Sequence, residues 1–253
     1  MNAVNEGLLN DKLVVVTASA GAGIGLATAK RALEEGATVV VSDTHDGRLM
    51  ATREQLLQIG PNVHAVRCDV TSQADVDSLF ETTEAHYGPI DVFINNAGLG
   101  GSSDLVDMSD DQWLRVLDVS LTGTFRCTRA AMTRMCPRGE GVIVNVSSVT
   151  AWRAEAGQAH YAAAKAGVLA LTRSAAMEAA PHGVRINAIA PTLAMHPFIE
   201  KVADPDVLAH WISVQPQKRP AEPREIADVI VFLASDLSSY MTGEVVSVGG
   251  QRA

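Results

Sequence analysis

The sequence predicts an α/β fold in which helices cover both faces of a doubly wound parallel sheet, within a single domain spanning residues 1–253. Two observations predict this fold. Short continuous apolar runs, typical of buried parallel strands, alternate along the chain with longer stretches of helical character. Polar residues suited to ligand binding recur directly after these runs, where the carboxyl ends of parallel strands meet.

The first half of the chain contains four such strands, each followed by a helix or a loop. They are expected at Lys12–Thr17, Thr38–Ser42, Val63–Cys68 and Ile90–Ile94. Gly36 ends the first helix and Gly60-Pro61 breaks the second. The third helix, Thr71–Tyr87, is expected to have Thr71 or Ser72 as its N-cap.

The second half continues the alternation. Ser109 opens a long helix that is expected to reach about Met135, before Pro137 and Gly139. Further strands are expected at Val142–Val146, Val184–Ala190 and Glu244–Val248. Helices are expected from Gln158 to about Ala180 and from Glu222 to Leu233, with an irregular stretch and one short helix in 191–220.

Composition and charge exclude several classes of protein. The chain is 47% hydrophobic with a formal net charge of −9, which argues against a nucleic-acid-binding surface. It contains neither an apolar run long enough to span a membrane nor a recognisable secretory signal. Cys68, Cys127 and Cys136 lack metal-site or disulfide spacing, so we expect buried thiols, no metal site and a cytoplasmic location.

A glycine cluster follows the first expected strand. Gly21, Gly23 and Gly25 lie between that strand and the next helix. Glycine lets the backbone approach a pyrophosphate, and the N–H groups and dipole of a helix N-terminus attract the anion. Such a cluster alone often marks only a tight turn, but its place in a βαβ unit favours a dinucleotide site.

Two aspartates follow the next two strands. Asp43 lies 18 residues after Gly25, where a carboxylate can bind the adenosine ribose and repel a 2′-phosphate. NAD(H) is therefore favoured and NADP(H) remains possible, since the nearby Arg48 weakens the discrimination. Asp69 is expected to bind the adenine amino group. For both aspartates, capping the following helix is the alternative.

A tyrosine and a lysine lie four residues apart in one expected helix. The spacing puts Tyr161 and Lys165 on one helix face, and Ser148 lies thirteen positions before Tyr161, at a strand end. We expect the lysine to lower the pKa of the tyrosine, which would then act as a general acid or base. This pattern also occurs by chance in many helices, so the assignment depends on the dinucleotide site beside it.

Together these residues resemble the short-chain dehydrogenase/reductase family, especially its 3-oxoacyl-carrier reductase-like branch, over essentially the whole chain. The resemblance rests on the glycine cluster, N-N-A-G at Asn95–Gly98, the Ser148, Tyr161 and Lys165 set, and Y-x-T-G-x-x-x-x-V-x-G-G at Tyr240–Gly250. It implies a Rossmann-type fold and hydride transfer between a nicotinamide and a carbonyl or carbinol carbon.

The resemblance also implies roles for single residues. Tyr161 would exchange a proton with the substrate oxygen, Ser148 would orient that oxygen, and Lys165 would hold the nicotinamide ribose. The residues expected to contact the cofactor are Thr17, Ser19, Gly21, Gly23, Ile24, Gly25, Asp43, Asp69, Val70, Asn95, Ala97, Gly98, Tyr161, Lys165, Pro191, Thr192 and His196.

The chain departs from the family pattern at four places. The glycine turn is one residue longer, with Ala18 in place of the first glycine, so it must bulge. Ser120 stands where the family usually has an asparagine of a proton relay, and it is expected to hold a relay water. Thr192 follows Pro191 in place of a glycine. His196 replaces a threonine that contacts the nicotinamide carboxamide, and it either takes over that contact, faces substrate or is a plain loop residue.

The substrate is expected to meet residues from 98–105, 149–158 and a lid at about 192–215. Apolar residues in the lid, and Trp152 near Ser148, predict a bulky apolar substrate, although these side chains could instead pack at a subunit interface. The stretch after the Tyr161 helix has no Lys or Arg, which favours a free or CoA-linked molecule over an acidic carrier protein. The altered glycine turn resembles actinobacterial reductases of steroid-ring breakdown.

Two functions remain open at this point. The first is an NAD(P)-dependent alcohol dehydrogenase or ketone reductase, and the second is a dinucleotide-sensing regulatory module without turnover. Because Tyr161 and Lys165 are both present, the enzyme is favoured. The last helices and Val245–Gly250 resemble the oligomer-forming end of the family, which predicts a homotetramer.

Overall fold

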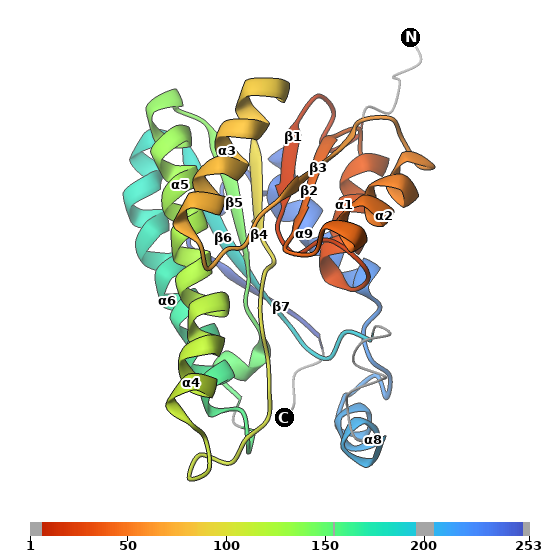
Figure 1. The fold of residues 1–253 in the computed structure, drawn as a ribbon, viewed down its shortest axis with the longest axis vertical. Helices are drawn as coiled ribbons and strands as arrows, with labels where there is room; N and C mark the ends of the chain where they lie inside the picture. The colour runs from red at the N-terminus through yellow and green to blue at the C-terminus, as the bar shows by residue number, and fades with distance from the viewer. Residues whose placement is uncertain (1–6, 154, 196–204, 250–253) are drawn as a thin grey trace.

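The computed structural model describes residues 7–153, 155–195 and 205–249, and its seven strands form one parallel sheet of order β3-β2-β1-β4-β5-β6-β7 (Figure 1). The strands are β1 Leu13–Val16, β2 Thr38–Asp43, β3 Val63–Arg67, β4 Val92–Asn95, β5 Gly141–Val146, β6 Val184–Pro191 and β7 Val245–Val248. The order reverses between β1 and β4, which creates the switch point of a doubly wound sheet. The predicted Rossmann-type fold is confirmed.

Helices cover both faces of this sheet (Figure 1). One layer contains α1, α2 and α9, and the other contains α3, α5 and α6. The helices are α1 Ile24–Glu34, α2 Asp46–Leu57, α3 Gln73–Tyr87, α4 Asp110–Leu117, α5 Gly123–Arg138, α6 Ala159–Ala179, α8 Pro205–Ser213 and α9 Pro223–Ala234. Ser72 caps α3 and Ser109 caps α4, as the sequence predicts.

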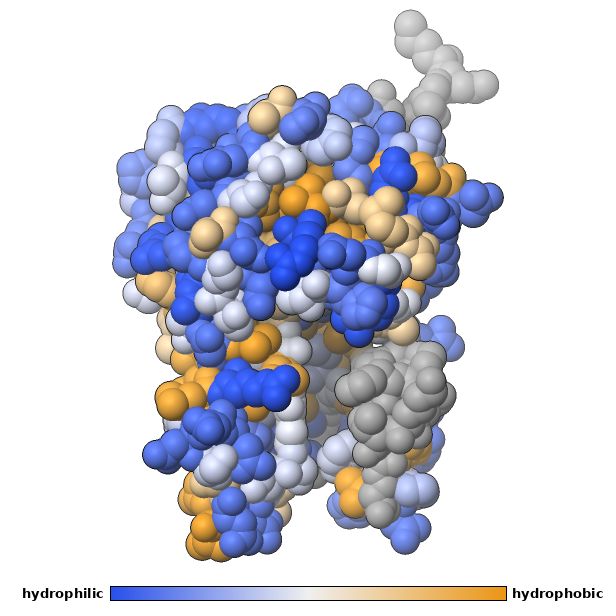
Figure 2. Space-filling view, in the orientation of Figure 1, coloured by the Kyte–Doolittle hydropathy of each residue, from blue (hydrophilic) through white to orange (hydrophobic). Residues whose placement is uncertain are grey.

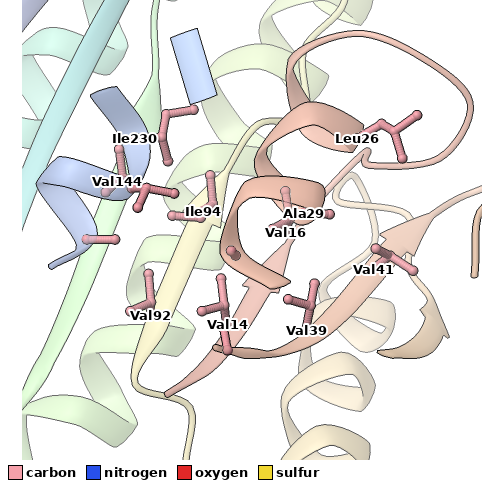
Figure 3. Close-up of a cluster of buried hydrophobic side chains, with 14 of the residues drawn as sticks. Val14, Val16, Leu26, Ala29, Val39, Val41, Val92, Ile94, Val144 and Ile230 are labelled. Carbon is pink, nitrogen blue, oxygen red and sulfur yellow. The ribbon is translucent and has the colours of Figure 1, made fainter. Parts of the chain in front are cut away.

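Alternate side chains of each inner strand divide the core in two. Val14 and Val16 of β1, with Ile94 of β4, pack against the α1 and α9 layer (Figure 3). Val15 of β1 and Phe93 of β4 point to the opposite face and pack against the layer of α3, α5 and α6. Since both faces are buried, the strands read as continuous apolar runs, which is why the sequence reveals them.

The long helix predicted from Ser109 to about Met135 is interrupted. Between α4 and α5 the chain forms a π-helical turn, Asp118–Thr122, in which the N–H of Gly123 bonds to the carbonyl oxygen of Asp118. The helix also continues to Arg138, so Pro137 lies in its last turn instead of beyond it. A π turn inserts one residue without breaking the helix, so its apolar pattern hides it.

The predicted lid is described at both of its ends, while 196–204 lies outside the described residues. A short parallel bridge between Ala194 and Ala221 joins these ends, with backbone bonds from Met195 to Ala221 and from Ala221 to Leu193. The short predicted helix is α8, and none of its residues is buried. This bridge therefore holds the two described ends of the predicted lid together.

Other expectations from composition concern metals, membranes and thiols. Within the described ranges there is no group of His, Cys, Asp and Glu that could hold a metal ion. No described helix is long and apolar enough to cross a membrane. The three cysteines are free, with Cys68 and Cys127 buried and Cys136 half-buried.

Ala18 has a left-handed backbone, with φ of 48°, in the glycine turn where the related pattern has glycine. We predict that Ala18→Gly raises the free energy of unfolding by up to about 1 kcal/mol, because glycine adopts this φ without strain. Urea denaturation measures the change. Ala27→Gly, inside α1, is the control and should lower the stability by about 1 kcal/mol. A loss of stability in Ala18→Gly would contradict the prediction.

Candidate active site

The carboxyl ends of β1, β4 and β5 meet the N-terminal half of α6, which carries the candidate catalytic residues. Ser148 follows β5, and its hydroxyl oxygen accepts a bond of 3.3 Å from the N–H of Thr150. Ser147, one residue earlier, donates to the carbonyl oxygen of Lys165 at 2.8 Å. This bond ties the end of β5 to α6, so Ser148, Tyr161 and Lys165 are brought together as predicted.

Burial raises the pKa of Tyr161. The Ser148 hydroxyl lies near the Tyr161 phenol, and its interaction with the phenol lowers the pKa of Tyr161 by only part of that amount. The net direction is opposite to the one that the sequence predicts. The prediction fails because the Lys165 nitrogen lies 5.7 Å from the centre of the Tyr161 ring and donates elsewhere. At neutral pH the phenol is therefore protonated.

Lys165 is 2% exposed and donates to the carbonyl oxygen of Val146 at 2.8 Å. Burial lowers its pKa to about 8, because the protein interior disfavours the charged ammonium. Desolvation is the one cause that acts on it. The cation is thus held by a backbone dipole, with two of its N–H donors left for a ligand.

The loop after β4 packs on α6 through its glycines. A Cβ atom at Gly98 would lie 3.2 Å from the Lys165 nitrogen, and one at Gly100 would lie 4.0 Å from the Tyr161 ring. A Cβ at Gly101 would lie 3.2 Å from Nε2 of His160. The loop is also joined to the loop before α6, since Gln158 donates to the carbonyl oxygen of Gly101 at 2.9 Å. These contacts pack residues 98–101 against the start of α6, beside Tyr161.

The glycine turn fits a pyrophosphate. Gly21 and Gly23 have positive φ angles of 92° and 98°, and Gly23 caps α1 without any side-chain bond. A Cβ at Gly25 would lie 2.5 Å from the amide nitrogen of Asn96, so only glycine allows this close packing. The first N–H groups of α1 are therefore free for an anion, as expected for the predicted site that begins at Gly21 and includes Ile24, the first residue of α1.

Thr17 and Asn96 join the two sides of the switch point. The Thr17 hydroxyl accepts bonds of 3.0 and 3.1 Å from the N–H groups of Asn96 and Ala97. The Asn96 amide donates to the carbonyl oxygens of Thr17 and Ala18, both at 3.0 Å. Asn96 lies inside the N-N-A-G motif, but it is not among the cofactor residues that the sequence predicts.

Two of the predicted cofactor residues have side chains that are engaged inside the protein. Ser19 is 0% exposed and bonds to the carbonyl oxygen of Val16 at 2.8 Å. The amide of Asn95 donates to Asn145 at 2.8 Å and to Thr128 at 3.1 Å. The Ser19 hydroxyl and both N–H groups of the Asn95 amide are therefore used within the protein, which leaves the Asn95 amide oxygen as the side-chain atom without a partner among the described residues.

Asn145 extends this buried network of hydrogen bonds. It is not among the residues that the sequence predicts for the site. Its amide donates to the Thr172 hydroxyl at 2.9 Å, which links β5 to α6. Asn145 is 0% exposed in an otherwise apolar strand. A polar residue in the middle of such a strand was the available signal.

Asp43 lies at the end of β2, 7% exposed, and Oδ1 accepts bonds from the N–H of His45 at 3.0 Å and from Arg48 at 2.9 Å. Arg48 also reaches the glycine turn, since its Cδ atom would lie 3.9 Å from a Cβ at Gly21. The pair therefore spans the space between β2 and the turn, where the sequence predicts the adenosine ribose.

The residues predicted near the adenine have local partners too. Asp69 accepts bonds from the N–H and the hydroxyl of Thr71 at 2.9 and 2.7 Å, so it supports the turn before α3 without being the cap. Val70 is 7% exposed and belongs to the core on the α3 side.

At the other end of the predicted site, Pro191 ends β6 opposite Val248 of β7. The N–H of Thr192 bonds to the carbonyl oxygen of Val248 at 3.0 Å. Thr192 also lines a cavity of about 210 Å³ with Gln215 and Arg219. The predicted contact from His196 lies outside the described residues.

In Figure 2 the lower end of the molecule divides into two parts, one carrying α4 and the other α8. Trp152, 48% exposed, follows the turn that begins at Ser148. The site combines a tyrosine proton donor, a serine hydroxyl and a glycine turn that suits a pyrophosphate.

Comparison with known proteins assigns this geometry to a family. The family described as Enoyl-(Acyl carrier protein) reductase matches residues 18–250. The chain belongs to the short-chain dehydrogenase/reductase family. It is accordingly an oxidoreductase acting on a CH–OH or C=O group.

Two relatives and one solved structure illustrate the similarity of this short-chain dehydrogenase/reductase to known proteins. The (5R,7aS)-5-hydroxy-7a-methyl-1-oxo-2,3,5,6,7,7a-hexahydro-1H-indene-carboxyl-CoA reductase of Mycobacterium tuberculosis is 57% identical, over 97% of this chain and 95% of its own. A 3-oxoacyl-[acyl-carrier-protein] reductase of Vibrio harveyi is 38% identical, over 96% and 97%. The crystal structure of a short chain dehydrogenase from Mycobacterium smegmatis has a TM-score of 0.87 at 53% identity, covering 98% of this chain and 95% of that one.

Proposed function

We propose that this enzyme transfers a hydride between NAD(H) and a bulky, mainly apolar ketone or secondary alcohol carried as a CoA thioester. The observation that carries the proposal is the placement of Ser148 and Tyr161 beside the buried Lys165, whose nitrogen lies 5.7 Å from the centre of the Tyr161 ring, at the edge of a sheet whose glycine turn suits a pyrophosphate. The hydride is the chemistry that a nicotinamide supplies when bound.

The chain's own groups handle the proton. The protonated Tyr161 phenol donates to the substrate carbonyl oxygen in reduction and takes the proton back in oxidation. Ser148 bonds the same oxygen and stabilises the charge that develops on it. The Lys165 cation is fixed by Val146 and has donors left for the ribose of the cofactor.

The CoA-linked, fused-ring substrate is supported by the 57% identical relative, whose name describes a methylated hexahydroindene carboxyl-CoA. That skeleton is a six-membered ring fused to a five-membered ring with a methyl at the fusion, as in two rings of a steroid. The exposed apolar side chains of Trp152, after Ser148, and Val207, on α8, suit such a substrate.

A regulatory module without turnover remains the second candidate. Ser148, Tyr161 and Lys165 are all present and mutually placed, which a module that only senses a dinucleotide would not need. The domain organisation, one unit over 1–253, and the cytoplasmic location stay predictions.

We also propose a homotetramer. The strand β7 is an edge of the sheet, and its three valines are only half-buried. Leu237 is 65% exposed nearby in sequence. An edge strand and apolar side chains left open to water are features that a second copy of the chain can cover.

Tyr161→Phe should lower kcat for a competent ketone by at least about 100-fold, because the proton donor is removed. Binding of NADH, followed by its fluorescence, should stay within about twofold. Tyr240→Phe is the matched control, since Tyr240 is fully exposed, and it should retain full turnover. Equal turnover by the wild type and Tyr161→Phe would sink the proposed mechanism.

Asp43→Ala should shift the ratio of kcat/KM for NADH over NADPH toward NADPH by about tenfold or more, because Arg48 is then free to meet a 2′-phosphate. Steady-state kinetics with both cofactors measures the ratio. In the double variant with Arg48→Ala the gain for NADPH should disappear. A wild type that prefers NADPH would show that the proposed preference is wrong.

Multi-angle light scattering should give a mass of four times the 26.7 kDa chain. Replacing Val245 by Lys on the edge strand should shift the distribution toward smaller species, because a charge is then placed in the proposed interface. A wild-type mass of one chain at micromolar concentration is the outcome that excludes the tetramer.

A further inference from the structure

Gly100 lies in the loop after β4, next to the Tyr161 ring, and neither its backbone nor its packing requires glycine. Its φ angle lies outside the left-handed region that favours glycine. Among the described residues, the one heavy atom within 4 Å of a Cβ placed there, apart from its chain neighbours, is Cδ2 of Tyr161, at 4.0 Å. The fold itself would therefore accept a side chain at this position.

The glycines on either side of Gly100 differ in this respect. A Cβ at Gly98 would lie 3.2 Å from the Lys165 nitrogen, and one at Gly101 would lie 3.2 Å from Nε2 of His160. Both distances are tighter than an ordinary van der Waals contact, so these two glycines let the loop pack on α6. Packing thus explains Gly98 and Gly101 but leaves Gly100 unexplained.

Hydrogen bonds hold the loop on both sides of Gly100. The Ser120 hydroxyl donates to the carbonyl oxygen of Leu99 at 3.0 Å and accepts from the N–H of Leu99 at 2.9 Å, so its one proton is used within the protein. Gln158 donates to the carbonyl oxygen of Gly101 at 2.9 Å. Because both neighbours are tied, Gly100 is not needed as a hinge, and a side chain there would be held in one place.

The space that such a side chain would fill is next to the reacting groups. The Tyr161 phenol meets the substrate oxygen at about 2.8 Å when it exchanges the proton, so groups attached to the reacting carbon lie close to the Tyr161 ring. The Lys165 nitrogen is over the ring, 5.7 Å from its centre, and Ser148 lies near the phenol. In the described part of the chain, the side toward Gly100 is thus left open.

We propose that Gly100 is a specificity-determining residue, whose missing side chain leaves room beside the Tyr161 ring for a second ring fused to the one that carries the reacting carbonyl. The proposal rests on the proposed function and deepens it, since it names the shape of ketone that the same site takes. A side chain at position 100 would narrow the site to ketones with small groups next to the carbonyl.

The test compares Gly100→Val and Gly100→Ala with Gly60→Ala. Gly60, between α2 and β3, is the matched control, because its φ also lies outside the left-handed region and the nearest atom to a Cβ there is Cδ2 of Leu33, at 3.9 Å. A Cβ is accommodated at both positions, so urea denaturation should show no loss of stability in any of the variants. If Gly100→Val does not fold, Gly100→Ala serves in its place.

Steady-state kinetics with NADH compares 2-decalone, which has two fused rings, with cyclohexanone, which has one. The ratio of kcat/KM for 2-decalone over cyclohexanone should fall by about tenfold or more in Gly100→Val, and by less in Gly100→Ala, because the added methyl groups take the space of the second ring. Gly60→Ala should keep the ratio of the wild type. An equal loss for both ketones in the Gly100 variants, or an unchanged ratio, would overturn the proposal.

Binding without turnover separates this proposal from the proposed mechanism. A ketone cannot be reduced while NAD⁺ occupies the site, so calorimetric titration of the two ketones into the NAD⁺ complex reports on shape alone. The ratio of the two affinities should fall in Gly100→Val as the kinetic ratio does, and a wild type that neither binds nor reduces 2-decalone would overturn the proposal. If Tyr161→Phe keeps the turnover of the wild type, the proposed function fails, while the affinity ratio still decides the role of Gly100.

Discussion

The structure depends on keeping one lysine ammonium out of water. Lys165 is buried between the end of β5 and the loop after β4, and its direct partner is the carbonyl oxygen of Val146. A charge in such a place is costly unless it is bonded, and the low pKa of Lys165 expresses that cost. The surrounding backbone is arranged to allow it, since the residue that covers the nitrogen is Gly98, which has no side chain.

Polar side chains hold this arrangement by fixing backbone to backbone. Thr17 and Asn96 join the glycine turn to the end of β4, and Ser147 joins the end of β5 to α6. The Ser147 bond is buried and the bonds between Thr17 and Asn96 are partly buried, so losing them would leave polar groups poorly solvated. These bonds join the strand ends around the predicted dinucleotide site, while a single short bridge joins the described ends of the predicted lid.

The charge states at the site favour one direction of chemistry. Burial raises the Tyr161 pKa, so the phenol holds its proton at neutral pH and can donate it to a carbonyl oxygen. Lys165 retains its charge only below about pH 8. Both states suit proton donation from Tyr161 to an oxygen atom of a substrate near neutral pH.

The sequence by itself determined the strands, the helix layers and the candidate residues Ser148, Tyr161 and Lys165. Continuous apolar runs such as Val14–Val16 report burial on both faces of a sheet, and a four-residue spacing on a helix is a local property. The sequence could not give the direction of the Tyr161 pKa, because desolvation depends on all the atoms packed around the ring. It also could not show that the Ser19 and Asn95 side chains face inward, or that Ser120 sits on a π turn bonded to Leu99. The bond between Ser19 and Val16 is local. The bonds of Asn95 with Asn145 and of Leu99 with Ser120 join residues far apart in the sequence, so they form only when distant strands and helices pack together.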